Sequence, residues 1–207
     1  MAEETLHYMQ QEKVDKAALD KLGLNEGTDD QTEKVNEQNQ PSSIDEDTQL
    51  GKGITVIGDS VILGAASYLE NILPGVVIDG EVGRQMIHAQ GVIDRLKEEG
   101  RLGDRIIIEL GTNGSFNTKQ LRNLLYSLSN AEQIFLVNTR VPREWQDTVN
   151  EDITEVAKEF SNTTVIDWHS ASEGKDYFFT QDGAHLKSEG AKYYASIIAE
   201  AVKGKSL

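Results

Sequence analysis

From Gly53 onward, short runs of apolar residues alternate with longer segments whose apolar residues recur at helical spacing. This alternation predicts five strands, at residues 54–57, 76–78, 105–110, 133–138 and 163–167. It also predicts five helices, at residues 61–73, 85–99, 119–128, 149–160 and 188–202. Short apolar strands separated by amphipathic helices form parallel sheets that are covered on both faces. We therefore expect an α/β fold, a three-layer α/β/α sandwich of flavodoxin-like type with a five-stranded parallel sheet.

The first fifty residues differ in composition from the rest of the chain. They carry 13 acidic residues and 4 lysines, and they contain no Phe or Trp. A segment this polar buries too little apolar surface to offset the entropy lost on ordering. We expect residues 1–50 to form an acidic, largely disordered tether and residues 51–207 to form the folded domain that carries the site.

Composition also excludes several classes of function. The chain has no cysteine, which excludes disulfides, thiolate metal sites and a cysteine nucleophile. Its net charge is −15 and its Lys and Arg residues are not clustered, so nucleic acid is not an expected partner. We expect no metal and no nucleotide cofactor, because neither metal-ligand spacing nor a phosphate-binding glycine loop is found. No apolar run approaches the ~18–20 residues that span a bilayer, and no secretion signal is visible.

The residues that follow the predicted strands are the candidates for chemistry, because ligands bind at the carboxyl ends of parallel strands. Ser60 follows the first strand at the start of a helix, where negative charge is favoured. Asp182 and His185 lie three residues apart, just before the last helix. An imidazole oriented by a carboxylate can activate a serine hydroxyl. Ordinary helix capping is the alternative for both Ser60 and Asp182.

Two glycine-containing turns could supply an oxyanion hole. Asn113 lies between Gly111 and Gly114 after the third strand, and its amide can donate a hydrogen bond. Gly83, after the second strand, could offer its backbone N–H to the same place. Such donors stabilise the charge that develops on a carbonyl oxygen during acyl transfer. Ordinary glycine turns are the alternative here.

The order of these four blocks resembles the SGNH (GDSL-type) hydrolase superfamily. That resemblance implies Ser60 as nucleophile with Asp182 and His185 as its partners. It also implies an oxyanion hole made by the Ser60 N–H, the Gly83 N–H and the Asn113 side chain. The lipase-like members have Leu after the serine, whereas this chain has Val61, which weakens a lipase interpretation.

A narrower resemblance rests on the run Val-Asn-Thr-Arg-Val-Pro-Arg at 137–143, together with residues 56–61, 79–85 and 182–186. These segments resemble the extracytoplasmic C-terminal domain of Gram-positive peptidoglycan O-acetyltransferases. The resemblance implies transfer of an acetyl group, through an acetyl-serine, to the 6-hydroxyl of N-acetylmuramic acid, which confers lysozyme resistance. It implies the peptidoglycan glycan strand as partner and an acetyl donor supplied by a membrane acyltransferase domain absent from this chain. It also implies a location at the extracellular face of the cell membrane.

The residues that would bind the acetyl acceptor are less well defined by the sequence. Arg140, Arg143 and Trp145 follow the fourth strand, where arginines could hold a carboxylate or acetamide and the Trp could stack on a sugar. A core Trp with solvated arginines is the alternative. His169, after the fifth strand, is a further candidate for the site. Two other functions remain open: a carbohydrate acetylesterase of the same fold, and a catalytically idle cell-wall-binding module.

Overall fold

The computed structural model describes residues 49–204. Its five strands are β1 (Ile54–Gly58), β2 (Val77–Gly80), β3 (Arg105–Glu109), β4 (Gln133–Val137) and β5 (Thr163–Ile166). They form one sheet in the order β2-β1-β3-β4-β5, and every neighbouring pair is parallel. This is the flavodoxin-like strand order of a doubly wound sheet, and the predicted fold class is confirmed. The predicted tether lies almost entirely outside the described residues.

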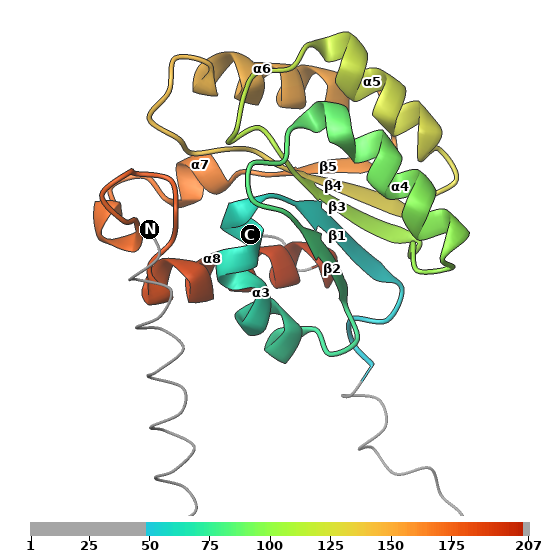
Figure 1. The fold of residues 1–207 in the computed structure, drawn as a ribbon, viewed down its shortest axis with the longest axis horizontal. Coiled ribbons are helices and arrows are strands. Elements are labelled where there is room, and N and C mark those ends of the chain that lie inside the picture. The colour runs from blue at the N-terminus through green and yellow to red at the C-terminus, as the bar shows by residue number, and fades with distance from the viewer. Residues whose placement is uncertain (1–48, 205–207) are drawn as a thin grey trace, which may run out of the picture. The chain divides into compact units, whose positions relative to one another are not determined.

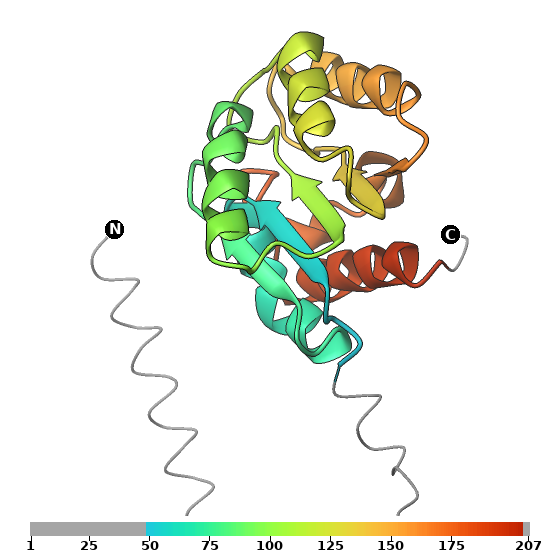
Figure 2. The same cartoon turned by 90° about the vertical axis from the view of Figure 1, so that its right-hand side faces the viewer.

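Helices cover both faces of the sheet, and each helical layer has its own apolar core (Figures 1 and 2). One layer contains α3 (Ser60–Ile72) and α8 (Ser188–Val202). The other contains the 3₁₀ turn η1 (Met86–His88), α4 (Ala89–Glu98), α5 (Thr118–Ser127) and α6 (Gln146–Ala157). Two short elements, α7 (Trp168–Ala171) and η2 (Asp176–Phe178), lie between β5 and α8. Among the helices of this part of the chain, none is long and apolar enough to cross a membrane.

Local signals in the sequence explain where the helices begin. The side chain of Asp59 accepts a hydrogen bond from the Val61 N–H and so caps α3. Asn117 and Gln120 form a reciprocal capping box at the start of α5. Caps of this kind satisfy backbone N–H groups that have no partner within the helix.

The prediction of a single helix over residues 85–99 was wrong in one respect. Its first turn is the separate 3₁₀ turn η1, and α4 begins only at Ala89. Ile87, which the helical spacing predicts to face inward, is 66% exposed. The tighter 3₁₀ turn rotates side chains by a different angle per residue, so the helical pattern does not apply there.

The strand register places the functional loops at one edge of the sheet. Gly58, the last residue of β1, lies opposite Gly80 of β2 and Glu109 of β3. Glu109 in turn lies opposite Val137 of β4. The strands therefore end side by side, and the loops after β1, β2, β3 and β4 leave the sheet together.

Candidate active site

The structure brings Ser60, His185 and Asp182 into one hydrogen-bonded chain at this edge. The Ser60 Oγ lies 2.9 Å from His185 Nε2, and His185 Nδ1 lies 2.5 Å from Asp182 Oδ2. Ser60 is the first residue of α3 and is half-buried, while the His185 and Asp182 side chains are about half exposed. A hydroxyl, an imidazole and a carboxylate in this order can pass a proton from the serine to the histidine.

A tight turn explains how Asp182 and His185 meet although they are only three residues apart. The Asp182 Oδ1 accepts hydrogen bonds from the backbone N–H groups of Ala184 and His185 and from the Thr180 hydroxyl. Gly183 has a φ of 73°, a left-handed conformation that glycine adopts without strain. The turn is thus folded around the same carboxylate that contacts the imidazole.

These contacts fix the charge of Asp182. Burial alone would raise the pKa of this carboxyl group, but hydrogen bonds from the Ala184 N–H, the His185 ring, the Thr180 hydroxyl and the His185 N–H outweigh it. The pKa of Asp182 is therefore held well below its ordinary value. The group is a carboxylate at neutral pH, and as such it accepts the Nδ1–H of His185.

Asn113 lies beside the start of α3. Its side-chain Nδ2 is 3.0 Å from Asp59 Oδ2 and 3.4 Å from the Arg84 carbonyl oxygen, and the Gln85 side chain donates to its backbone oxygen. Asp59 directly precedes Ser60. The structure therefore brings the Asn113 amide to the residue next to Ser60.

Gly83 lies in a turn that begins right after β2. The Arg84 N–H donates to the Glu81 carbonyl at 3.2 Å, and Gly83 has a φ of 77° at the third position of the turn. A positive φ at that position is the mark of a type II turn. The buried Arg84 guanidinium holds this turn to β1 and β2 through the carbonyl oxygens of Gly58 and Asp79. The turn is thus fixed to the strand that leads to Ser60.

A hollow of about 240 Å³ adjoins His185 and Asn113. Arg143 and Trp145, from the loop after β4, are among its lining residues. Arg143 is exposed, whereas the Trp145 indole N–H donates to the Gly111 carbonyl at 3.1 Å. The hollow is lined by Thr112, Asn113, Val141, Arg143, Trp145, Asp182, Ala184 and His185.

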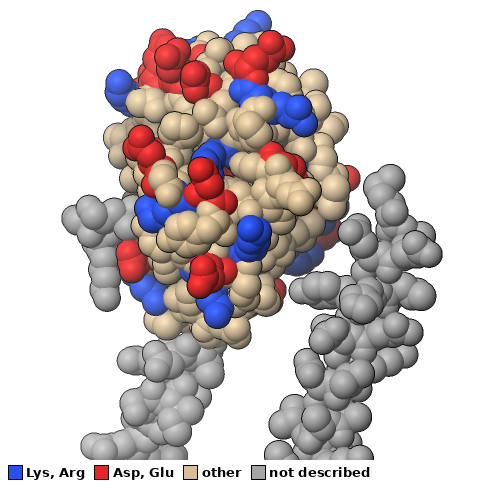
Figure 3. Space-filling model, turned by 90° about the vertical axis from the view of Figure 1, so that its left-hand side faces the viewer, with Lys and Arg blue, Asp and Glu red and all other residues tan. Residues whose placement is uncertain are grey.

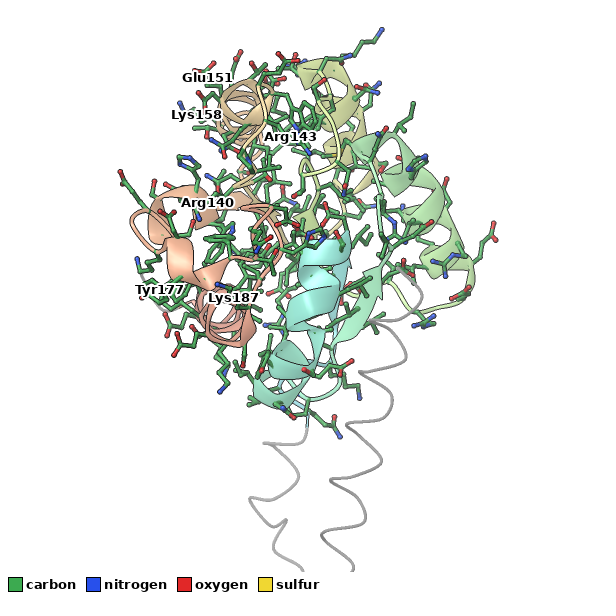
Figure 4. The ribbon with its side chains drawn as sticks, turned by 60° about the vertical axis from the view of Figure 1, so that its left-hand side comes forward. Arg140, Arg143, Glu151, Lys158, Tyr177 and Lys187 are labelled. Atoms are coloured by element: carbon green, nitrogen blue, oxygen red, sulfur yellow. The ribbon has the colours of Figure 1, made fainter. Side chains whose placement is uncertain are left out.

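Arg140 lies apart from that hollow. Its guanidinium pairs with Asp176 of η2 at 2.5 Å and stacks over the Phe179 ring, 4.0 Å from its centre. Figure 4 shows Arg143 toward α6 and Arg140 toward α7, on the side of Tyr177. Of the three acceptor candidates, Arg143 and Trp145 line the hollow next to His185, and Arg140 is engaged elsewhere.

His169 does not join Ser60 and His185. Its Nε2 lies 3.2 Å from Gln146 Nε2, and it lines a separate polar hollow between α6 and α7. Within residues 49–204, no group of three or more His, Asp or Glu side chains is arranged to hold a metal ion. On the face shown in Figure 3, acidic and basic side chains are intermixed and form no single basic patch.

Two buried acids were not singled out from the sequence. Asp59 is fully buried, and Glu109, the last residue of β3, is 4% exposed. The N–H of Asp59, the residue before Ser60, donates to Glu109 Oε2 at 3.1 Å. The signal that could have revealed Glu109 is a lone acidic residue at the end of the apolar run 106–108.

Known proteins match this chain both in sequence and in fold. No protein-family model matches the chain. The peptidoglycan O-acetyltransferase OatA of Listeria monocytogenes is 44% identical over 142 residues, which cover 69% of the chain and 22% of that protein. The C-terminal catalytic domain of OatA from Streptococcus pneumoniae superposes with a TM-score of 0.67 at 25% identity, over 75% of the chain and 95% of that domain.

A protein from Slackia heliotrinireducens described as an SGNH hydrolase superposes with a TM-score of 0.58 over 72% of the chain and 97% of its own length. At 16% identity it shows the fold alone. In fold the chain resembles SGNH hydrolases, and in both sequence and fold it resembles peptidoglycan O-acetyltransferases. The predicted SGNH-type fold is confirmed, and the relatives that match the chain in sequence are named O-acetyltransferases. The chain spans only 22–26% of the length of the relatives it matches.

Proposed function

We propose that this domain transfers an acetyl group to the 6-hydroxyl of N-acetylmuramic acid in peptidoglycan, through an acetyl-serine at Ser60. The observation that carries the proposal is the hydrogen-bonded chain from Ser60 to His185 to Asp182, with distances of 2.9 and 2.5 Å. Two relatives are named peptidoglycan O-acetyltransferases, which supports an acetyl transferase that acts on peptidoglycan. The S. pneumoniae domain was solved with a methylsulfonyl adduct, so that relative forms a covalent adduct.

The first half-reaction forms the acetyl-enzyme. The Ser60 hydroxyl gives its proton to His185 Nε2 while its oxygen attacks the carbonyl carbon of the donor. Negative charge develops on the carbonyl oxygen, where the Ser60 N–H, the Gly83 N–H and the Asn113 amide would donate. His185 then returns the proton to the leaving group, the bond to the donor breaks, and the acetyl ester remains on Ser60.

The second half-reaction repeats these steps with the sugar. The 6-hydroxyl gives its proton to His185 and attacks the acetyl carbon, and the new tetrahedral intermediate meets the same donors. When it collapses, the bond to Ser60 breaks and the serine oxygen takes the proton back from His185. Asp182 stabilises the imidazolium and orients the ring in both halves.

We place the acceptor in the hollow beside His185. Arg143 is the cation of that hollow and is suited to a carboxylate or an acetamide oxygen, and Trp145 offers an aromatic wall. The acceptor role considered for Arg140 requires its ion pair with Asp176 to open first.

The remaining parts of the proposal follow from the resemblance to the longer relatives. A membrane acyltransferase domain would supply the acetyl group, and the domain would work at the extracellular face of the cell membrane, with the glycan strand as its partner. Residues 1–50, with their acidic composition, would form the tether between the two.

A carbohydrate acetylesterase is the second candidate, and one observation favours it. The His185 side chain is 50% exposed, so water can reach the imidazole that would activate an acceptor hydroxyl. Transfer and hydrolysis use the same residues and differ in whether a sugar or water attacks.

The test is to incubate the domain with an activated acetyl ester, with and without peptidoglycan fragments, and to analyse the products by mass spectrometry. We expect O-acetylated glycan to form at the expense of free acetate. Free acetate alone at saturating glycan would make the domain an esterase. Binding of glycan without any turnover would make it a wall-binding module.

A further inference from the structure

Glu109 fills a space that a neighbouring strand leaves empty. It lies opposite Gly58, the last residue of β1, and it is 4% exposed. A Cβ atom at Gly58 would come within 2.6 Å of Glu109 Oε2. Because Gly58 has no side chain, the Glu109 carboxyl group can reach across from β3 to the turn that leads to Ser60.

The Glu109 carboxyl group binds the backbone of the turn between β1 and α3. Its Oε2 accepts the N–H of Asp59, the residue before Ser60, at 3.1 Å. The side chain of Asp59 makes other hydrogen bonds, in which Oδ1 accepts the Val61 N–H and Oδ2 accepts the Asn113 amide. A single residue thus links Glu109 to the start of α3 and to Asn113.

Few groups can compensate a negative charge on the buried carboxyl groups of Glu109 and Asp59. Asp59, from the turn between β1 and α3, and Tyr194, from α8, are fully buried and face Glu109. The guanidinium of Arg84, which donates to the Gly58 carbonyl, pairs with Asp79 and Glu81, and the charge of His185 acts on Asp59 without a hydrogen bond between them. Within residues 49–204, neither Asp59 nor Glu109 forms an ion pair with Lys, Arg or His.

Two carboxyl groups that are buried near each other, with no ion pair to Lys, Arg or His in residues 49–204, do not both ionise. Burial raises the pKa of Glu109 well above its ordinary value, and the negative charge of Asp59 raises it further. Burial also raises the pKa of Asp59, but hydrogen bonds from Val61, Thr112 and Asn113 favour its charged form. Hydrogen bonds from the Asp59 and Ile62 N–H groups and from Tyr194 lower the pKa of Glu109, but burial outweighs them, so the proton resides on Glu109.

We propose that Glu109 is a positioning residue for the Ser60 nucleophile and that it works as a neutral, protonated carboxylic acid. The proposal rests on the role of Ser60 in the proposed function. The neutral acid keeps the Asp59 N–H, and with it Ser60 and Asn113, in place without putting a second charge beside Asp59. Loss of its proton at alkaline pH would place a second buried negative charge beside Asp59 and so destabilise the turn, even though a carboxylate accepts the Asp59 N–H more strongly.

The kinetic test compares Glu109→Gln and Glu109→Ala in the hydrolysis of a small chromogenic acetate. Gln is neutral and nearly the same shape, so it should keep kcat within about threefold of wild type. Ala removes the support, and a nucleophile displaced by about 1 Å can lose ~10²-fold in kcat, with KM little changed. Glu98→Gln, an exposed side chain on α4, is the matched control and should behave as wild type.

The pH dependence of stability tests the proton itself. A carboxyl group whose pKa is raised in the folded state contributes most stability below its unfolded value, and that contribution is lost as pH rises through the folded value. The free energy of unfolding of wild type should therefore fall relative to Glu109→Gln as pH rises above 4.5, the ordinary pKa of Glu. Glu98→Gln should run parallel to wild type.

Infrared spectroscopy detects the protonation state of the Glu109 carboxyl group directly. At neutral pH, wild type should show the carbonyl stretch of a protonated carboxylic acid, and Glu109→Gln should lack it. The proposal is overturned if that band is absent in wild type, or if wild type and Glu109→Gln have the same pH dependence of stability. It is also overturned if Glu109→Gln loses as much kcat as Glu109→Ala, or if Glu109→Gln does not fold. Spectroscopy and stability do not depend on the acetyl acceptor, so a failure of the proposed transferase function would remain distinguishable.

Discussion

At the scale of single residues, the Asp182 carboxylate connects local folding with catalysis. It accepts four hydrogen bonds, three at Oδ1 from its own turn and one at Oδ2 from the His185 ring. We expect Asp182→Asn to keep the turn but to favour the wrong imidazole tautomer, a change that costs ~10⁴ in kcat in a well-studied triad. Steady-state hydrolysis of a chromogenic acetate measures this loss. Near-full activity of Asp182→Asn would leave a Ser60–His185 dyad and remove Asp182 from the mechanism.

Asn113 provides a second prediction at this scale. If its amide stabilises the oxyanion, it acts in both half-reactions, because each passes through a tetrahedral intermediate. Asn113→Ala should therefore slow acetyl-enzyme formation and breakdown alike, by ~10²–10³. Rapid-quench kinetics separate the two steps. A variant that slows only one of them would show that Asn113 merely supports Asp59, with which it is hydrogen-bonded at 3.0 Å.

At the scale of elements, the loop after β4 should separate transfer from hydrolysis. Arg143 lines the hollow beside His185, is exposed and forms no ion pair within residues 49–204, so it is available to bind an acceptor, whereas water needs no binding surface. A charge-assisted hydrogen bond contributes ~1.5–3 kcal/mol, so Arg143→Ala should lower the ratio of transfer to hydrolysis by ~10- to 100-fold. Arg101→Ala, an exposed arginine ahead of β3, is the matched control and should leave the ratio unchanged. An unchanged ratio in Arg143→Ala would move the acceptor site elsewhere.

The strands and the longer helices were predictable because their apolar spacing is regular over many residues. The elements α7 and η2 have four and three residues, too few to show a period, and both were missed. Glu109 was missed for a different reason. It lies at the end of an apolar strand, and its role depends on Gly58, which is 51 positions away in sequence and adjacent only through the strand register.

At the scale of the whole molecule, the acidic segment 1–50 and the folded domain should be separable. The segment carries 13 acids and 4 lysines, so it offers few apolar contacts to the domain. Deleting residues 1–48 should leave hydrolysis of a soluble acetate within about twofold and the melting temperature nearly unchanged. A large loss of either would mean that the segment packs on the domain, and the predicted boundary would be wrong.

The central claim, that Ser60 becomes acylated with the help of His185, is tested most directly by covalent labelling. Methanesulfonyl fluoride should add one methylsulfonyl group to the peptide that carries Ser60, as found by digestion and mass spectrometry. Ser60→Ala should remain unlabelled, His185→Ala should label far more slowly, and Ser115→Ala, an exposed serine near Asn113, should label like wild type. A label on another residue, or none on a folded protein that still turns over acetate, would contradict the account.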